Sequence, residues 1–302
     1  MAVVIRYYHR KLNKDCIVND QSLETRTAGV VLVVVSAIVF SSAGIFTKWV
    51  PTPAWDIIFW RGVSAASFTF IYLALRGNLV REIRLFGKPA LLVTVMMGLG
   101  TATFIPAFKL SSVANVALIY GAAPFVAAGL SWVFIKELPT RTVLIASIAA
   151  FTGVFVVVSG SLGSSRMQGD MLAMFMTLMM AGTMVVYRKY PSTTAALPAA
   201  LSSVLLLPLA FAFGEPLSAP TTDLPVLVCF GLVFAVASVT LSEGARRLPS
   251  AETALLSTLE MPLASILALL ILSEVPTPAM LLGGAIILAA VVWSQRQPQS
   301  GL

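Results

Sequence analysis

The sequence predicts an all-α polytopic membrane protein, with ten transmembrane helices arranged as two inverted five-helix repeats around a central cavity. Three observations lead to this fold: an apolar composition spread along the chain, ten apolar runs separated by turn-forming residues, and a similarity between the two halves. Of the 302 residues, 58% are hydrophobic and 11% are charged, and the mean hydropathy is +0.92. Soluble domains carry roughly 25% charged residues. One soluble core cannot bury so much apolar surface, so a bilayer must cover it.

Ten runs are long enough to span a membrane. A hydrocarbon core about 30 Å thick needs about 20 apolar residues in a helix that rises about 1.5 Å per residue. Helices are expected because an open sheet cannot satisfy its backbone hydrogen bonds in lipid. The runs fall at 28–48, 55–75, 89–108, 112–135, 142–160, 169–187, 194–213, 225–243, 251–272 and 277–293. Connections rich in Pro, Gly and Ser, such as "VPTP", "KELPT" and "SEVPTP", separate them.

The basic residues predict the orientation. If the N-terminus is cytoplasmic, Lys48, Lys109 and Arg166 fall outside, and Arg61 lies within a span. The other 16 of the 20 Lys and Arg residues fall inside: Arg6, Arg10, Lys11, Lys14, Arg26, Arg76, Arg81, Arg84, Lys88, Lys136, Arg141, Arg188, Lys189, Arg246, Arg247 and Arg296. Positive residues favour the cytoplasmic side. We therefore expect a multi-pass protein of a bacterial-type inner (plasma) membrane with both termini cytoplasmic. The net charge of +7 forms no basic face with interleaved aromatic residues, so the bilayer, and not nucleic acid, is the expected partner.

The two halves of the chain resemble one another. Residues 29–51 align with 169–191, which places Lys48 opposite Arg188; residues 109–124 align with 247–262, and "KELPT" (136–140) with "SEVPT" (273–277). Each half holds five predicted helices, an odd number, so the second half must enter the membrane inverted. The predicted organisation is a cytoplasmic tail (1–27), a first repeat (28–160), a linker (161–168), a second repeat (169–293) and a cytoplasmic tail (294–302).

These spans, repeats and acid-and-proline exits resemble the EamA-type branch of the drug/metabolite transporter superfamily, which includes bacterial exporters of amino acids and related metabolites. The resemblance covers roughly residues 28–293. It implies export, a cavity between the first four helices of each repeat, and a peripheral position for 142–160 and 277–293. It also implies a structural role at helix ends for four residues: Glu137, Pro139, Glu274 and Pro276.

Glu260 is the first candidate site residue. It lies in the apolar run "ALLSTLEMPLASILALLIL", about 13 Å inside a helix that begins near Ala251. An acid near the midplane costs about 2.5 kcal/mol or more if it faces lipid, so it should face the bundle interior or a wet cavity. Pro262 frees a backbone carbonyl near Thr258, which with Ser257 and Glu260 would form a polar patch. Such a patch suits a substrate ammonium or proton coupling; the alternative is a protonated acid that bonds a neighbouring helix.

Arg61 is the only basic residue well inside a predicted span. It could pair with Glu260, hold a substrate carboxylate, or extend to the outer interface as long basic side chains do. The further candidates for the cavity lining are aromatic or polar: Trp60, Phe104, Phe108, Asn115, Tyr120 and Tyr187. The candidates for kinks and gating are Pro106, Pro124 and Pro262.

Several chemistries are excluded. The only histidine is His9, in the N-terminal tail, and the sequence holds no phosphate-binding G-x-x-x-x-G-K-[ST] loop. We therefore expect neither an enzyme nor a cofactor or metal, and energy must come from a substrate gradient or an ion gradient, with protons as the candidate ion. The predicted function is export of small amphiphilic metabolites by alternating access, most of all amino acids, aromatic or of broad range. The alternatives are export of multiple drugs, quaternary amines or lipid precursors by the same fold, or a membrane scaffold or membrane-embedded enzyme.

Overall fold

The protein is helical throughout the part of the chain that the structure describes. The computed structural model describes residues 26–136, 138, 141–160, 166–190, 192–245, 247, 256–257 and 259–296. These residues form helices joined by short connections, so the predicted all-α class is confirmed. Most of both predicted tails lies outside the described residues.

The first helix spans Arg26–Trp49 and is interrupted by a turn at Ser42, after which its last part is α2 (Ala43–Trp49). The other helices follow in order: α3 (Ala54–Leu75), α4 (Leu79–Arg84), α5 (Lys88–Leu110), α6 (Val113–Tyr120), α7 (Ala123–Ile135), α8 (Arg141–Ser159), α9 (Arg166–Lys189), α10 (Ala196–Phe213), the 3₁₀ turn η1 (Pro216–Ser218), α11 (Leu224–Ala245), α13 (Glu260–Leu272) and α14 (Pro278–Arg296).

Seven helices in the described residues are long and apolar enough to cross a membrane, α6 and α7 together forming one of them. Three shorter apolar helices correspond to the remaining predicted spans: Leu144–Ser159, Glu260–Leu272 and Pro278–Ala290. The chain is therefore a multi-pass membrane protein. That it crosses ten times stays a prediction.

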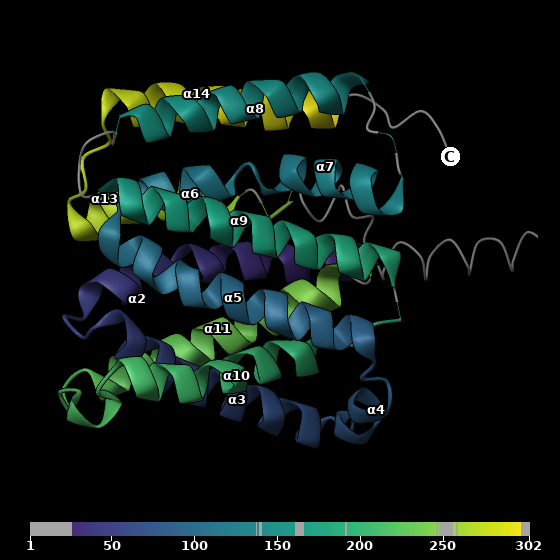
Figure 1. Ribbon diagram of the computed structural model, residues 1–302, viewed down its shortest axis with the longest axis vertical. Helices are drawn as coiled ribbons and strands as arrows, with labels where there is room; N and C mark the ends of the chain where they lie inside the picture. The colour runs from purple at the N-terminus through teal and green to yellow at the C-terminus, as the bar shows by residue number, and fades with distance from the viewer. Residues whose placement is uncertain are drawn as a thin grey trace, which may run out of the picture.

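Helices of the two halves pack in corresponding pairs. In Figure 1, α8 and α14 form one edge of the bundle, and α3 and α10 lie at the opposite edge. The contacts α3·α10 and α8·α14 each join a helix to its predicted counterpart in the other half. Two further contacts are equivalent to one another. Since α3 corresponds to α10 and α5 to α11, the contact between α3 and α11 has its counterpart in the contact between α10 and α5. This pattern is the one that the predicted relation between the two repeats would produce, and α8 and α14 lie at the periphery of the bundle.

The α8·α14 pair is close and antiparallel. A Cβ added to Gly153 would lie 2.7 Å from the Gly283 carbonyl oxygen and 2.7 Å from Ile287 Cγ1, and one added to Gly283 would lie 2.6 Å from Val157 Cγ2. Gly153 on α8 thus lies next to Ile287 on α14, and Val157, one turn later on α8, lies next to Gly283, one turn earlier on α14. The two helices therefore run in opposite directions. Small residues permit such close approach of membrane helices.

Carboxylates at helix ends link the two halves. Asp56, in the first turn of α3, accepts the Glu215 backbone N–H at 2.8 Å, and Glu82 on α4 accepts the Leu197 backbone N–H at 2.7 Å. Hydrogen bonds to ionised acceptors are stronger than neutral ones. They therefore hold α3 against the chain around α10 at both ends of the pair.

The two acid-and-proline exits share one backbone feature. Lys136 (φ 65°) and Ser273 (φ 55°) are the non-glycine residues with positive φ in the described part of the chain, and they end α7 and α13. The alignment of "KELPT" with "SEVPT" makes them equivalent positions. A left-handed conformation costs a residue with a Cβ about 1–2 kcal/mol, so its occurrence at both exits indicates a shared local structure. Glu137 and Pro139 lie outside the described residues.

Candidate functional site

Two helices are interrupted at equivalent positions next to a small cavity. α6 ends at Tyr120 and α7 begins at Ala123, after a turn at 121–122, and α13 begins at Glu260 after a turn at Leu259. These turns coincide when 109–124 is aligned with 247–262. Pro124 and Pro262 lie in the first turns of α7 and α13, where a proline removes no intrahelical hydrogen bond. Interrupted helices of this kind form the sites of many transporters near the bilayer midplane.

The interruption corrects one expectation. We expected a helix that begins near Ala251 and holds Glu260 about nine residues inside, but Glu260 is the first residue of α13. The acid therefore lies at the positive end of a helix dipole, which favours a negative charge. It is about 18 Å along the axis from Leu272, well within a core about 30 Å thick.

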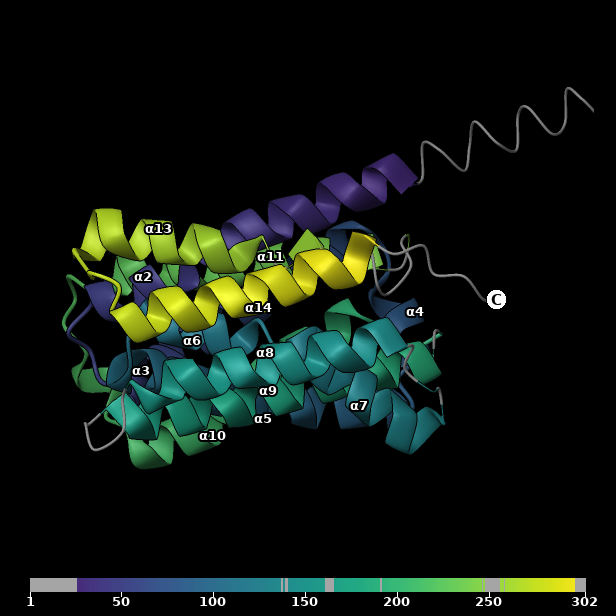
Figure 2. The same ribbon diagram turned by 90° about the horizontal axis from the view of Figure 1, so that it is seen from above.

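Glu260 lines a cavity of about 10 Å³, which is room for about one water. Four predicted site residues come together in it: Phe104, Phe108, Tyr120 and Glu260. The rest of the lining is Phe40, Ser41, Gly44, Val116, Ala117, Met176 and Ala264. The walls come from the first helix and from α5, α6, α9 and α13, so both halves contribute. Figure 2 shows α13 beside the end of the first helix, from which three of the lining residues come.

Arg61 does not pair with Glu260: among the described residues, no ion pair joins them. It is 1% exposed, and its Cζ lies 4.1 Å from the centre of the Phe234 ring and 5.6 Å from that of Phe230. Its Nε and Nη1 atoms find no hydrogen-bond partner in the part of the chain described. The Phe234 ring also contacts Phe40, centre to centre at 5.8 Å. A layer of two rings therefore separates the Arg61 guanidinium from the Glu260 cavity.

The other predicted residues lie elsewhere. The indole Nε1 of Trp60 donates to the Pro216 carbonyl oxygen at 2.8 Å, at the end of the bundle. Tyr187 and Ser257 are half-buried, and neither belongs to the cavity lining. Pro106 lies inside the continuous helix α5. Thr258 lies outside the described residues.

Asn115 was predicted to line the cavity but instead binds Asp170. Its Nδ2 donates to both carboxylate oxygens of Asp170, at 3.3 and 3.1 Å, and Ser111 Oγ donates to the same carboxylate. Asp170 is fully buried on α9, and it was not among the predicted site residues. The signal was present, because Asp170 is an acid at the start of the predicted apolar run 169–187. Asn115 is not among the residues that line the cavity, because its amide donates to the buried carboxylate of Asp170 on the neighbouring helix.

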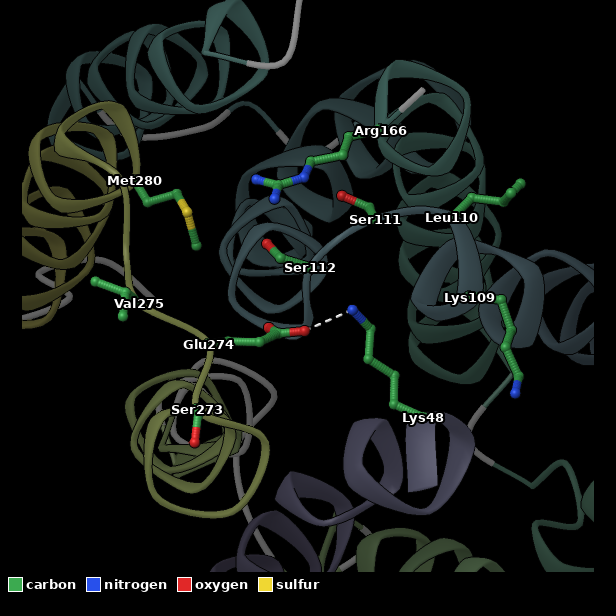
Figure 3. A pocket seen from close by; sticks show the side chains of 10 residues that line it. All are labelled: Lys48, Lys109, Leu110, Ser111, Ser112, Arg166, Ser273, Glu274, Val275 and Met280. Carbon is green, nitrogen blue, oxygen red and sulfur yellow. Dashed lines mark hydrogen bonds and ion pairs between the residues drawn. The ribbon is translucent and has the colours of Figure 1, made fainter. Parts of the chain in front are cut away.

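A second pocket of about 520 Å³ lies at one end of the bundle (Figure 3). It is lined by all three basic residues predicted to lie outside, Lys48, Lys109 and Arg166, so we name this end the outer end. The other lining residues are Leu110, Ser111, Ser112, Ser273, Glu274, Val275 and Met280. In Figure 3, Lys48 and Glu274 point toward one another, whereas the Lys109 side chain points away from them. Lys109 donates to the Val50 carbonyl oxygen at 2.6 Å.

Glu274 makes two bonds across this pocket. Its Oε1 accepts from Lys48 Nζ at 2.5 Å, and its Oε2 accepts the Val113 backbone N–H at 2.9 Å, at the start of α6. The left-handed Ser273 ends α13 immediately before it, and both the Ser273 and Glu274 N–H groups bond the Ala268 carbonyl oxygen. This C-terminal arrangement is typical of helices that end in a left-handed residue. It aims Glu274 back toward the ends of α2 and α6.

Comparisons with known proteins agree with this architecture. Residues 27–159 and 167–295 each match the EamA-like transporter family, so the chain carries two copies of the family's unit. A solved structure titled "Crystal structure of protein" superposes with a TM-score of 0.67 at 15% sequence identity, covering 91% of this chain and 100% of that chain. No curated protein matches the sequence. With two matches that together cover most of its length, the chain belongs to the EamA-like transporter family.

Proposed function

We propose that this member of the drug/metabolite transporter superfamily exports small amphiphilic metabolites, foremost amino acids, across a bacterial-type inner membrane by alternating access. Membership of the family indicates a membrane transporter of small molecules. The substrate class, the direction, the membrane and the mechanism are the proposal. The observation that carries it is Glu260, an acid deep in the bundle that lines a cavity walled by both halves.

The chemistry of the cavity favours an ammonium group. Phe40, Phe104, Phe108 and Tyr120 line the same cavity as Glu260. Aromatic faces attract cations, and the attraction strengthens when water is excluded. A carboxylate among aromatic rings therefore suits a substrate that carries a positive nitrogen and apolar bulk.

Arg61 favours a substrate that also carries a carboxylate. Its guanidinium, buried against Phe234, has donors without partners in the described chain, and guanidinium groups bind carboxylates with two parallel hydrogen bonds. A movement of the Phe40 and Phe234 rings would join its site to the Glu260 cavity. The two charges then match the two charges of an amino acid, and they disfavour a simple quaternary amine.

Alternating access is supported by the relation between the halves. The counterpart helices α8 and α14 run antiparallel, as expected when two repeats are inverted in the membrane. Two inverted copies of similar structure have two arrangements of similar energy, one open to each side. In the present arrangement the cavity around Glu260 has room for about one water, which is too small for an amino acid.

The test is uptake into proteoliposomes, with amino acids of each class, quaternary amines, a sugar nucleotide and a lipid precursor, each with and without a pH gradient. We expect apolar and aromatic amino acids to move, and Glu260→Gln to slow them by about tenfold or more, since a charge-assisted bond worth about 1.5–3 kcal/mol is lost. An excess of quaternary amine should compete weakly. Movement of the sugar nucleotide or lipid precursor while every amino acid fails would refute the substrate class.

A further inference from the structure

The outer end of the bundle is closed by one carboxylate. We propose that Glu274 is the outer gate residue of the transport pathway, and that its bonds to Lys48 and to the Val113 N–H, here named the outer latch, must break before the cavity opens to the outside. The inference rests on the proposed function only in assuming a pathway through the Glu260 cavity. It assigns Glu274 a role beyond the end of a helix.

The latch joins three elements that must separate for the pathway to open. Lys48 is on α2, Val113 begins α6, and Glu274 follows α13. Each of these elements also lines the Glu260 cavity or directly continues a helix that does. Both carboxylate oxygens are used, so breaking the latch releases α2 and α6 from α13 together.

The latch lies about one helical turn above the cavity. Gly44 lines the cavity and Lys48 lines the outer pocket, while Ser112 lines the outer pocket and Val116 the cavity. In each case the four-residue separation corresponds to about 6 Å along a helix. The outer pocket therefore lies directly outside the Glu260 cavity, and only a layer of packed side chains about one helical turn thick separates the two.

That layer is tightly packed. A Cβ on Gly44 would lie 2.8 Å from Phe108 Cε1 and 2.8 Å from Val113 Cγ1, so the glycine lets α2 touch both side chains. Phe108 and Val113 are almost fully buried, at 5% and 0% exposure. We name Gly44, Phe108 and Val113 the plug. The latch holds the plug shut, because Val113 belongs to both.

Cysteine labelling tests the gate without any substrate, so its failure is distinguishable from failure of the transport proposal. In a protein with Cys16 and Cys229 replaced by Ser, Ala117→Cys reports the cavity, and a membrane-impermeant thiol reagent is added outside intact cells. Glu274→Gln should raise the labelling rate of position 117 by about tenfold or more, the change expected when a charge-assisted bond is lost. Lys48→Glu should do the same, and Lys48→Glu combined with Glu274→Lys should restore slow labelling.

Two controls keep the result specific. Glu215→Gln removes an exposed acid next to η1, at the end of α10, and should leave labelling unchanged. Ile287→Cys, fully buried against α8, should stay unlabelled in the Glu274→Gln protein. Unchanged labelling of position 117 in Glu274→Gln and Lys48→Glu, or an equal rise at position 287, would overturn the gate.

Discussion

Replacing Arg61 by Met separates a structural role from a functional one. The guanidinium is 1% exposed and lies over the Phe234 ring at 4.1 Å. A desolvated cation–π contact is worth about 2 kcal/mol. Against it, Nε and Nη1 lack hydrogen-bond partners in the described chain, and each buried unsatisfied donor costs about 1–3 kcal/mol.

Methionine keeps the length and the apolar stem, and its sulfur makes favourable contacts with aromatic rings. Removing two unmet donors gains about 2–6 kcal/mol, and losing the cation–π contact costs about 2 kcal/mol. Arg61→Met should therefore be as stable as the parent, or up to about 4 kcal/mol more stable. Transport of an amino acid should nevertheless fall by about tenfold or more, because the substrate carboxylate loses its partner.

The assay pairs reversible unfolding in mixed detergent micelles with initial rates in proteoliposomes. Arg61→Lys is the matched control, since it keeps the charge but loses the planar fork, and it should transport at an intermediate rate. If Arg61→Met is destabilised by more than about 2 kcal/mol, the cation–π contact outweighs the unmet donors and the energetic reasoning is wrong. If it transports normally, Arg61 does not hold substrate.

Three further predictions concern the scaffold. Gly283→Leu should lower the free energy of unfolding by about 1–3 kcal/mol, because its Cβ would lie 2.5 Å from the backbone of α8. Gly129→Ala is the control and should leave this free energy unchanged, since its Cβ would meet nothing within 4 Å. Both are measured by unfolding in micelles, and equal stabilities would contradict the close α8·α14 packing. Asp170→Asn should cost about 1–3 kcal/mol in the same assay, since its amide would face the amide of Asn115 as a second donor; an unchanged midpoint would count against that bond. Trp60→Phe loses one hydrogen bond to η1, so the free energy of unfolding should fall by about 1 kcal/mol while the transport rate stays unchanged. A large loss of transport would indicate that Trp60 contacts the substrate.

The sequence predicted the fold through properties that need no side-chain geometry. Run length, charge asymmetry and the repeated exits depend only on order along the chain, and the helical class and the paired halves follow from them. The aromatic cavity residues Phe104, Phe108 and Tyr120 were also predicted, as aromatic side chains within the third and fourth predicted spans.

What the sequence could not predict is which way each side chain points. A helix that is apolar on all sides has no pattern to mark its inner face. Asn115 therefore turned out to bind Asp170, and Arg61 lies behind Phe234 and not beside Glu260. The start of α13 at Glu260 was missed for a related reason: Pro262 was interpreted as a kink within one helix, whereas it lies in the first turn of a new one.

Reactivity of a cysteine at the cavity position 117 addresses the central idea directly: a pocket between the two halves is reached by water from one face at a time. In a protein without other thiols, an impermeant reagent should label Ala117→Cys from each face in turn as a transported amino acid shifts the conformation, and bound substrate should protect it. A residue that stays unreactive from both faces, with and without every permeant tried, would contradict the account.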